Sequence, residues 1–233
     1  MNAPHTPEQL ESLRRLDACT LANAIETFHV RLRNEGFASG ALRCQFPRLQ
    51  PMVGYAATIK IRGASPPTGG AATYLENTDW WDYILSVPAP RIVVVQDVSS
   101  VPARGAFLGE VHVNILRALG CTGAVTNGAV RDVPAVENLG FHFFAAALAV
   151  SHSYVHIVET GQPVQIDGLT IASGDLLHGD LHGIQTIPHE TVAELPKVSA
   201  NIVARERALI ALARTPHLPL EKLRAAVAGE RSV

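Results

Sequence analysis

The stretch Gly109–Asp132, GEVHVNILRALGCTGAVTNGAVRD, decides the fold and carries the polar side chains of greatest interest. Its first half has helical spacing and opens on a Gly-Glu pair. The apolar segment Gly123–Asn127 then predicts a buried strand. We expect Asn127–Val130 to form a turn, with Arg131 and Asp132 in the loop that follows the strand.

The segments on either side extend this pattern. Arg91–Gln96 (RIVVVQ) is a continuous apolar run, which is typical of a strand buried on both faces. His142–Leu148 predicts a further strand, and Val133–Leu139 predicts a short helix that ends before a glycine. This alternation of strands and helices indicates parallel β-α-β units and hence an α/β fold. Val53–Arg62 is rich in β-branched residues and adds another strand.

The first part of the chain predicts two helices and a loop. Thr6 and Gln9 form a capping box around Pro7, and Thr20 is the expected cap of a second helix. Residues 31–50 show no period and predict a loop.

Residues 63–70 form a connector rich in glycine and proline, which we expect to be mobile. Residues 73–87 have helical spacing and contain Trp80 and Trp81. We expect these two rings in the core or at a subunit contact. The alternative is an aromatic wall of a substrate pocket.

The second half of the chain is predicted to be richer in antiparallel strands. Asp167-Gly168 lies between two alternating segments and is a hairpin signal. Residues 174–183 predict a polar turn, and a long helix is expected from Thr191 to Arg214. We therefore expect one α/β domain over residues 1–190 and a helical extension over 191–233.

Composition narrows the class of protein. Hydrophobic residues make up 47% of the 233 residues and charged residues 17%, which is typical of a globular chain. The net charge of −2 gives no electrostatic signature of nucleic-acid binding. No CxxC pair occurs among the three cysteines, and no apolar run reaches the roughly 18 residues of a membrane span. We expect a soluble cytoplasmic protein with no nucleic-acid or membrane partner.

Four polar residues near the two loops are candidates for chemistry. Arg131 offers a fork of donors for a carboxylate or an enolate oxygen, and Asp132 offers a hard oxygen ligand for Mg²⁺ or Mn²⁺. Glu110 lies in the first turn of a helix whose free amides favour an anion, and His112 follows two residues later. Three of these residues also have a purely structural explanation. Asp132 can cap the helix that follows it, and Glu110 can be stabilised by the helix dipole. His112 can be a partly buried residue of the helix. Because one β-α unit separates the two loops, we expect them to meet at the same end of the sheet.

The segments GE…GAVTNGAVRDVPAVENLGF and GDLLHGDLHGIQTIP resemble the RraA-like family over roughly Leu16–Pro188. That family includes class II 4-hydroxy-4-methyl-2-oxoglutarate aldolases and regulators of ribonuclease E activity. The resemblance implies a swivelling α/β/β/α fold and a homotrimer or homohexamer with sites at subunit interfaces. It also implies a lyase that uses Mg²⁺ or Mn²⁺ to cleave aldols that yield pyruvate and to decarboxylate oxaloacetate. The alternative is a non-catalytic regulator that binds ribonuclease E.

The resemblance also implies roles for individual residues. The substrate-binding tetrad of the family falls on four consecutive residues, Gly109, Glu110, Val111 and His112. The substrate arginine falls on Arg131 and the metal aspartate on Asp132. Arg131 and Glu110 are the expected catalytic residues, with Glu110 orienting a metal-bound water that moves the proton. The aldolases commonly have leucine at the third and fourth tetrad positions and a shorter aspartate at the second. The substrate is therefore expected to be a 2-keto acid that the sequence does not identify further.

A second metal site is the main rival prediction. Asp175, His178, Asp180 and His182 have a spacing that recurs in zinc enzymes. The other interpretation is that this segment shapes the edge of the pocket or a subunit contact.

Overall fold

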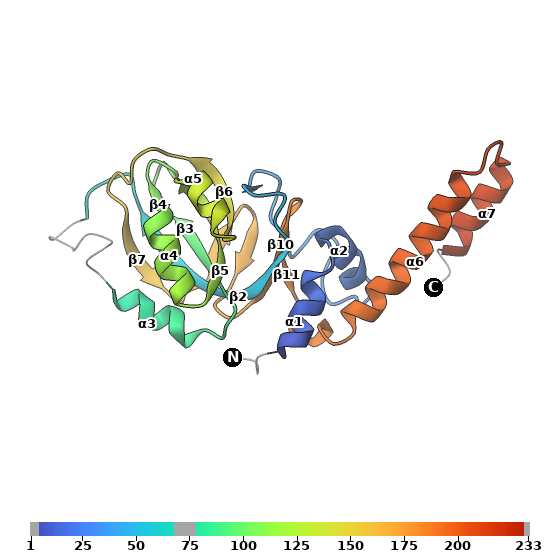
Figure 1. The fold of residues 1–233 in the computed structure, drawn as a ribbon, viewed down its shortest axis with the longest axis horizontal. Helices are drawn as coiled ribbons and strands as arrows, with labels where there is room; N and C mark the ends of the chain where they lie inside the picture. The colour runs from blue at the N-terminus through green and yellow to red at the C-terminus, as the bar shows by residue number, and fades with distance from the viewer. Residues whose placement is uncertain (1–4, 68–77, 231–233) are drawn as a thin grey trace.

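The structure, a computed structural model, describes residues 5–67 and 78–230. A mixed nine-stranded sheet forms the centre of this part of the chain (Figure 1). Its strands are β1 (Arg43–Cys44), β2 (Met52–Arg62), β3 (Arg91–Asp97), β4 (Ala106–Leu108), β5 (Cys121–Val130), β6 (His142–Leu148), β7 (His156–Thr160), β10 (Leu176–Asp180) and β11 (Gly183–Ile187). The order along the sheet is β1-β6-β5-β3-β2-β10-β11, while β4 pairs with β5 and β7 pairs with β2.

The centre of the sheet is parallel, as the order of elements predicts. β2, β3, β5 and β6 run in one direction and pair in the order in which they are named. Four consecutive residues of β3, Ile92–Val95, are fully buried. This burial explains the unbroken apolar run, since a parallel strand inside an α/β fold is covered on both faces.

The outer strands are antiparallel. β10 pairs with the first half of β2 and β7 with its second half, so this eleven-residue strand has two successive neighbours on one side. A separate hairpin, β8 (Val164–Ile166) and β9 (Leu169–Ile171), turns at Asp167 and Gly168. Both turn residues have positive φ, which confirms the predicted hairpin.

Helices cover one face of the sheet. These are α3 (Asp79–Ser86), α4 (Glu110–Ala118) and α5 (Val133–Asn138). Each places an apolar side chain in the larger core: Ile84, Val113 and Val136 are fully buried. The other face is covered by the β8–β9 hairpin, whose apolar side chains form a second core with those of the sheet. The sheet thus lies between a helical layer and a second β layer.

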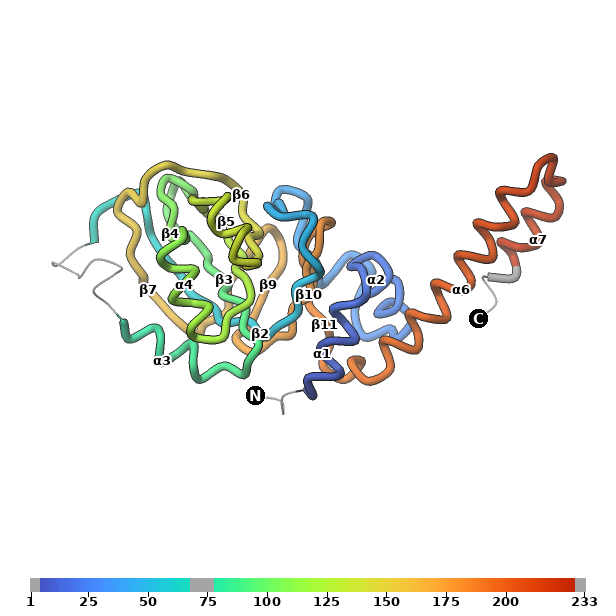
Figure 2. The backbone as a smooth tube through the Cα atoms, viewed as in Figure 1, coloured from blue at the N-terminus to red at the C-terminus, as the bar shows by residue number. Residues whose placement is uncertain are grey.

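The first two helices and the start of α6 (Leu195–Ala213) lie together beside the sheet (Figure 1). α2 (Ala18–Glu26) packs next to the β10–β11 hairpin and α1 (Pro7–Arg14) packs against β2, and α6 begins against both helices (Figure 1). Leu195 is fully buried in this contact. Further along, α6 runs away from the sheet and α7 (Leu220–Glu230) folds back along its far end (Figure 2). The predicted domain boundary at residue 190 stays a prediction.

Several local predictions need correction. The capping box of α1 at Thr6 and Gln9 is confirmed, but the cap of α2 is Asp17, not Thr20. Thr20 lies inside that helix, and its backbone N–H and hydroxyl both donate to the Asp17 carboxylate. The predicted long helix starts at Leu195, after a short 3₁₀ turn over His189–Thr191.

The largest errors concern strands. The predicted turn Asn127–Val130 is the second half of β5, which continues to Val130. Half of the predicted polar turn 174–183 is strand β10, all five residues of which are buried. Residues 68–77, which include part of the predicted connector and the start of the predicted helix 73–87, lie outside the described residues. In the described part of the chain, no helix combines the length and the apolar character needed to cross a membrane.

Gly54 provides a test of how tightly β2 packs against the start of β3. A Cβ added at Gly54 would lie 2.7 Å from the carbonyl oxygen of Pro90, which is backbone and cannot easily move. We expect Gly54→Ala to lower the free energy of unfolding by about 1–3 kcal/mol because of this overlap.

Urea denaturation measures the effect, with Gly40→Ala as the matched control. A Cβ at Gly40 meets no atom within 4 Å, so this variant should change stability by less than about 0.5 kcal/mol. Equal stabilities for the two variants would contradict the predicted overlap.

Candidate functional site

The two loops that carry the candidate residues leave the sheet side by side. β4 and β5 pair in parallel, with Leu108 opposite Val130. The backbone N–H of Arg131 donates to the carbonyl of Leu108 at 3.0 Å and continues this ladder by one residue. α4 begins immediately after β4, and Asp132 follows β5. The sequence therefore brings a helix start and an Arg-Asp pair to one end of the sheet, as expected.

Asp132 is the residue that joins the two loops. It occupies the cap position of α5, but its side chain makes no capping hydrogen bond to that helix. Its Oδ2 atom instead accepts the backbone N–H of Glu110, the first residue of α4, at 3.0 Å. The Nε atom of Arg131 lies 3.4 Å from the same oxygen. The carboxylate thus fixes the start of α4 and carries a guanidinium beside it.

The backbone of Asp132 has the left-handed conformation, with φ of 56° and ψ of 32°. Aspartate is one of the few residues that adopt this region without a large steric cost. The conformation directs the side chain away from the amides of α5 and towards α4. Asp132 therefore occupies the predicted cap position of α5, but its side chain does not cap that helix.

Gly109 permits this close approach. Its φ of −149° is ordinary extended backbone, so conformational freedom is not the reason for the glycine. A Cβ at this position would instead lie 2.5 Å from Asp132 Oδ2 and 3.0 Å from Arg131 Cγ. A side chain at residue 109 would push the carboxylate and the guanidinium out of place.

The other three tetrad residues point in different directions. The side chains of Glu110 and Val111 are exposed, with Val111 at 62%. His112 is buried, and its ring lies 5.1 Å from the Phe107 ring and 6.2 Å from the Trp80 ring, measured between centroids. Burial lowers the pKa of His112 to about 4, and the nearby His152 and Arg131 add to this effect. His112 is therefore a neutral ring beneath the site.

The candidate site lies beside a surface hollow of about 470 Å³. Arg131 and Asp132 form its polar part, and their side chains are 29% and 39% exposed. Its opposite wall is the end of β6 with the residues that follow, from Leu148 to Val150. The two tryptophans are remote from this wall: Trp80 belongs to the core and Trp81 packs against it, as expected.

Two residues near the site were not predicted from the sequence. His152 follows β6. Burial and the positive charge of Arg131 lower its pKa, and the negative charge of Asp132 acts in the opposite direction. Asp97 ends β3 and is 2% exposed; its carboxylate accepts the backbone N–H groups of Ser99 and Ala103, each at 2.9 Å. Both follow the carboxyl ends of parallel strands, a position that could have marked them.

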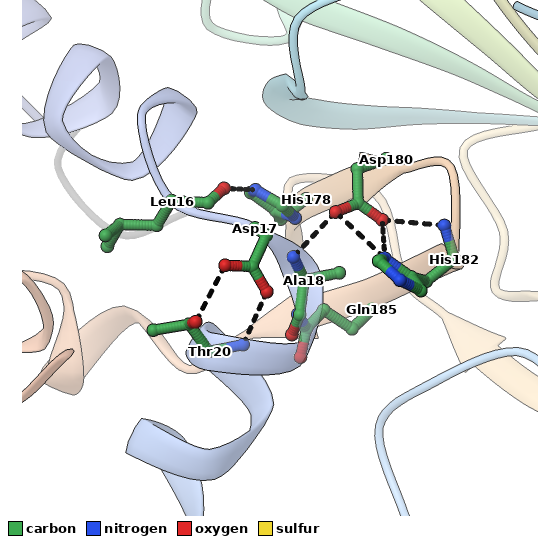
Figure 3. Close-up of polar contacts among 8 residues, drawn as sticks. All are labelled: Leu16, Asp17, Ala18, Thr20, His178, Asp180, His182 and Gln185. Atoms are coloured by element: carbon green, nitrogen blue, oxygen red, sulfur yellow. Dashed lines mark hydrogen bonds and ion pairs between the residues drawn. The ribbon is translucent and has the colours of Figure 1, made fainter. Parts of the chain in front are cut away.

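The rival metal cluster does not form a ligand set. Asp180 is 5% exposed, and its oxygens accept the backbone N–H groups of Ala18 and His182, each at 2.8 Å, while Nδ1 of His182 lies 3.1 Å away (Figure 3). Nε2 of His178 donates to the Leu16 carbonyl at 3.0 Å (Figure 3). Asp175 is further along and accepts the backbone N–H of Ala172. Asp180 and His178 hold the start of α2 against the β10–β11 hairpin.

Within residues 5–67 and 78–230, no group of three or more His, Cys, Asp or Glu side chains is placed to surround a cation. In the described residues, a site built around Asp132 would therefore have at most two such side chains from this chain. Mg²⁺ fits such a donor set, because it keeps several waters and is often bound through one or two carboxylates. A structural zinc site, which normally has four protein ligands, does not fit.

Comparison with known proteins now identifies the family. The profile of the RraA-like family, described as Aldolase/RraA, matches residues 18–185. The chain belongs to the RraA-like family. The match covers both loops of the candidate site and all of the sheet except the end of β11, so the resemblance read from the sequence is confirmed.

Individual relatives match only part of the chain and at low sequence identity. A protein of Halalkalibacterium halodurans named "Putative 4-hydroxy-4-methyl-2-oxoglutarate aldolase" is 31% identical over 126 residues, which are 52% of this chain and 60% of that protein. The chain thus spans less than two thirds of this relative.

Among solved structures, an uncharacterised protein from Pseudomonas syringae has a TM-score of 0.73 at 23% identity and covers 97% of this chain and 96% of its own. RraAS2 from Streptomyces coelicolor, an unusual member of the RNase ES inhibitor RraA family, has a TM-score of 0.68 at 21% identity, covering 88% and 96%. These structures confirm the RraA-like α/β fold.

The depressed pKa of His112 predicts a specific pH dependence of stability. In the unfolded chain this ring has the ordinary pKa of 6.5, whereas in the folded protein it is about 4. Below pH 6.5 the unfolded state takes up a proton that the folded state does not. The free energy of unfolding should therefore fall by about 3 kcal/mol between pH 6.5 and pH 4 on account of this residue.

Urea denaturation of the natural protein and of His112→Phe across this pH range isolates the part of the pH-dependent stability that comes from His112. Phenylalanine keeps an aromatic ring between Phe107 and Trp80 but has no proton to bind. We expect the variant to lose less stability than the natural protein as the pH falls. Parallel curves for the two proteins would show that His112 is not buried as a neutral ring.

Proposed function

We propose that this protein is a divalent-metal-dependent carbon–carbon lyase that acts on a 2-keto acid. The observation that carries the proposal is the Asp132 carboxylate, which is partly exposed, held by the amide of Glu110 and paired with Arg131. Its left-handed backbone keeps it away from its own helix. Membership of the Aldolase/RraA family and the similarity to the H. halodurans protein support an aldolase.

In this proposal, Asp132 is the residue that would hold Mg²⁺ or Mn²⁺. When bound, the metal supplies Lewis-acid stabilisation of negative charge on the carbonyl oxygen of the substrate. Arg131 binds the substrate carboxylate or the developing enolate oxygen with its planar fork of N–H donors. Preorganised charges of this kind are usually the largest contribution to such catalysis.

The bond changes follow from enolate chemistry. In retro-aldol cleavage the substrate hydroxyl loses its proton, a carbonyl forms there, and the electrons of the broken C–C bond pass to the enolate of pyruvate. In oxaloacetate decarboxylation the same enolate forms as carbon dioxide leaves. Protonation of the enolate carbon gives pyruvate. We assign proton transfer to Glu110, whose exposed carboxylate begins α4 beside the Arg131–Asp132 pair, and substrate binding to the Gly109–His112 segment.

We propose that the working form is a homotrimer or homohexamer. The hollow beside Asp132 is open, and three apolar side chains near it are largely exposed: Val111 at 62%, Leu148 at 60% and Val150 at 98%. Exposed apolar surface beside a pocket is typical of an interaction site. A neighbouring copy would cover this surface and close the hollow over a small substrate.

The second candidate function is a non-catalytic regulator of ribonuclease E, which is supported by the similarity of fold to RraAS2. The site favours the lyase, because a binding protein has no need of a partly exposed carboxylate held beside an arginine. An assay of oxaloacetate decarboxylation, run beside a pull-down with the ribonuclease, separates the two.

Arg131→Ala tests the proposed role of the guanidinium. We expect kcat/KM for oxaloacetate to fall by about 10²–10³-fold, as when other transition-state donors are removed. Asp132→Asn should be similarly impaired yet folded, since an asparagine oxygen can still accept the Glu110 amide and asparagine tolerates the left-handed backbone. Arg205→Ala, an exposed arginine on α6, is the matched control and should keep full activity. If Arg131→Ala decarboxylates oxaloacetate at the rate of the natural protein, the role proposed for Arg131 is refuted.

Removal of the metal gives an independent test. Treatment with a chelator should abolish decarboxylation, and Mg²⁺ or Mn²⁺ should restore it. The far-UV circular dichroism should not change, because one carboxylate of the chain binds the metal and the fold does not depend on it. Full activity after exhaustive chelation, or stoichiometric zinc in protein purified without added ions, would contradict the proposal.

A further inference from the structure

Three rings meet where the segment before α1, strand β2 and the turn before α6 come together. His5 precedes α1, Tyr55 lies in β2, and His189 begins the short 3₁₀ turn that leads to α6. The ring planes are nearly parallel, with angles of 7° between His5 and Tyr55, 18° between His5 and His189, and 11° between Tyr55 and His189. Tyr55 is 2% exposed, whereas the two histidines are partly buried. The proposed lyase chemistry uses none of these rings.

The two imidazole rings are joined head-on. Nε2 of His5 lies 3.0 Å from Nδ1 of His189, and the two ring centroids are 5.2 Å apart. The difference between these distances is close to the width of one imidazole ring, so both nitrogens and both centroids lie almost on one line. Because the N–H bond or the lone pair of an imidazole nitrogen points along that line, the pair forms a nearly linear hydrogen bond.

Neighbouring groups determine which of the two nitrogens donates. Nε2 of His189 lies 3.2 Å from the carbonyl oxygen of Gly174, which can only accept, so this Nε2 carries a proton. In the neutral ring, Nδ1 of His189 is then an acceptor and Nε2 of His5 is the donor. The backbone N–H of His5 also donates to the Tyr55 hydroxyl at 2.6 Å. These bonds tie His5 to β2 and to the turn before α6.

The line between the two rings can hold one added proton but not two. A singly protonated pair still has one donor and one acceptor on that line, and its hydrogen bond becomes charge-assisted. When both rings are protonated, two N–H groups face each other across 3.0 Å and neither finds an acceptor. The two positive charges also repel each other. The pair therefore takes up its protons in two coupled steps, and the second step breaks the bond.

The surroundings do not compensate the second charge. Within residues 5–67 and 78–230, no carboxylate lies within 4.0 Å of a nitrogen of either ring. Besides Tyr55, the titratable side chains on the adjoining segments are Glu8, Asp175 and Glu190. The two glutamates are exposed, and the aspartate accepts a backbone N–H within its own turn. Burial and the charge of His189 lower the pKa of His5, in agreement with this geometry.

We propose that His5 and His189 form a proton-operated clasp that ties the segment before α1 to the base of α6 and opens when both rings are protonated. The open form binds one proton more than the closed form, so a fall in pH favours the open form. Leu10 and Leu13 are buried in the core and keep the rest of α1 in place. The opening is therefore local to the described residues that precede Leu10.

A double-mutant cycle with His5→Gln and His189→Gln, measured by urea denaturation of the full chain, tests the clasp. At about pH 7.5 we expect the coupling between the two histidines to change the unfolding equilibrium constant by about two- to tenfold, the value of one hydrogen bond. At about pH 4.5 this coupling should be absent. His112 is present in all four proteins, so its own pH dependence cancels. Equal coupling at the two pH values, or no coupling at the higher one, would overturn the proposal.

Titration of the histidine rings by NMR in the folded protein decides the question even if a variant of the cycle does not fold in acid. In the natural protein, His5 and His189 should each titrate in two coupled steps. In His189→Gln, His5 should titrate in one step, at a higher pH than the second step of the pair. His29→Asn is the matched control and should leave the titration of His5 unchanged, because His29 is exposed and asparagine tolerates its left-handed backbone. If His5 titrates identically in the natural protein and in His189→Gln, the clasp is refuted.

Discussion

The position of β5 is the constraint on which the rest of the structure depends. It pairs in parallel with β3 on one side and β6 on the other, and β4 joins its far end. Each of these strands therefore delivers its following loop to the same edge of the sheet. The start of α4, the Arg131–Asp132 pair and His152 meet there for that reason, although 43 positions separate the first and last of these in the sequence (Gly109 and His152).

The hydrogen bond between Asp132 and Glu110 fixes the two loops at this edge relative to each other. Parallel strands bring two loops near each other, but they do not fix the side chains. Here one carboxylate takes the place of the cap that Gly109 cannot supply, since a glycine has no side-chain oxygen. A helix start normally favours negative charge, so Asp132 stabilises α4 while its partly exposed carboxylate faces solvent. Stability and the proposed metal-binding role therefore do not compete at this residue.

Much of the fold and the pairing of the two loops could be predicted, because both follow from local patterns. The apolar run of β3 and the order of strands and helices were sufficient. The polar content of β10 concealed that strand, since Nε2 of its His178 and the carboxylate of its Asp180 bond to the backbone at the start of α2, more than 150 residues earlier. Asn127 and Gly128 suggested a turn, but Asn127 instead bonds to the backbone of Asp97 in the neighbouring strand. His152 has no motif around it, and only the fold places it near Arg131.

The bond from Ala18 to Asp180 has a consequence for the order in which the protein folds. The first helices cannot complete their contacts until the β10–β11 hairpin, about 160 residues later, has been synthesised. Contacts between such distant parts of a chain slow folding, because the intervening loop must close first. During synthesis on the ribosome, the contacts of α2 with β10, β11 and α6 therefore stay unformed, and its apolar face uncovered, until nearly the whole domain has emerged. The parallel β-α-β centre, which needs only residues 52–148, can form before them.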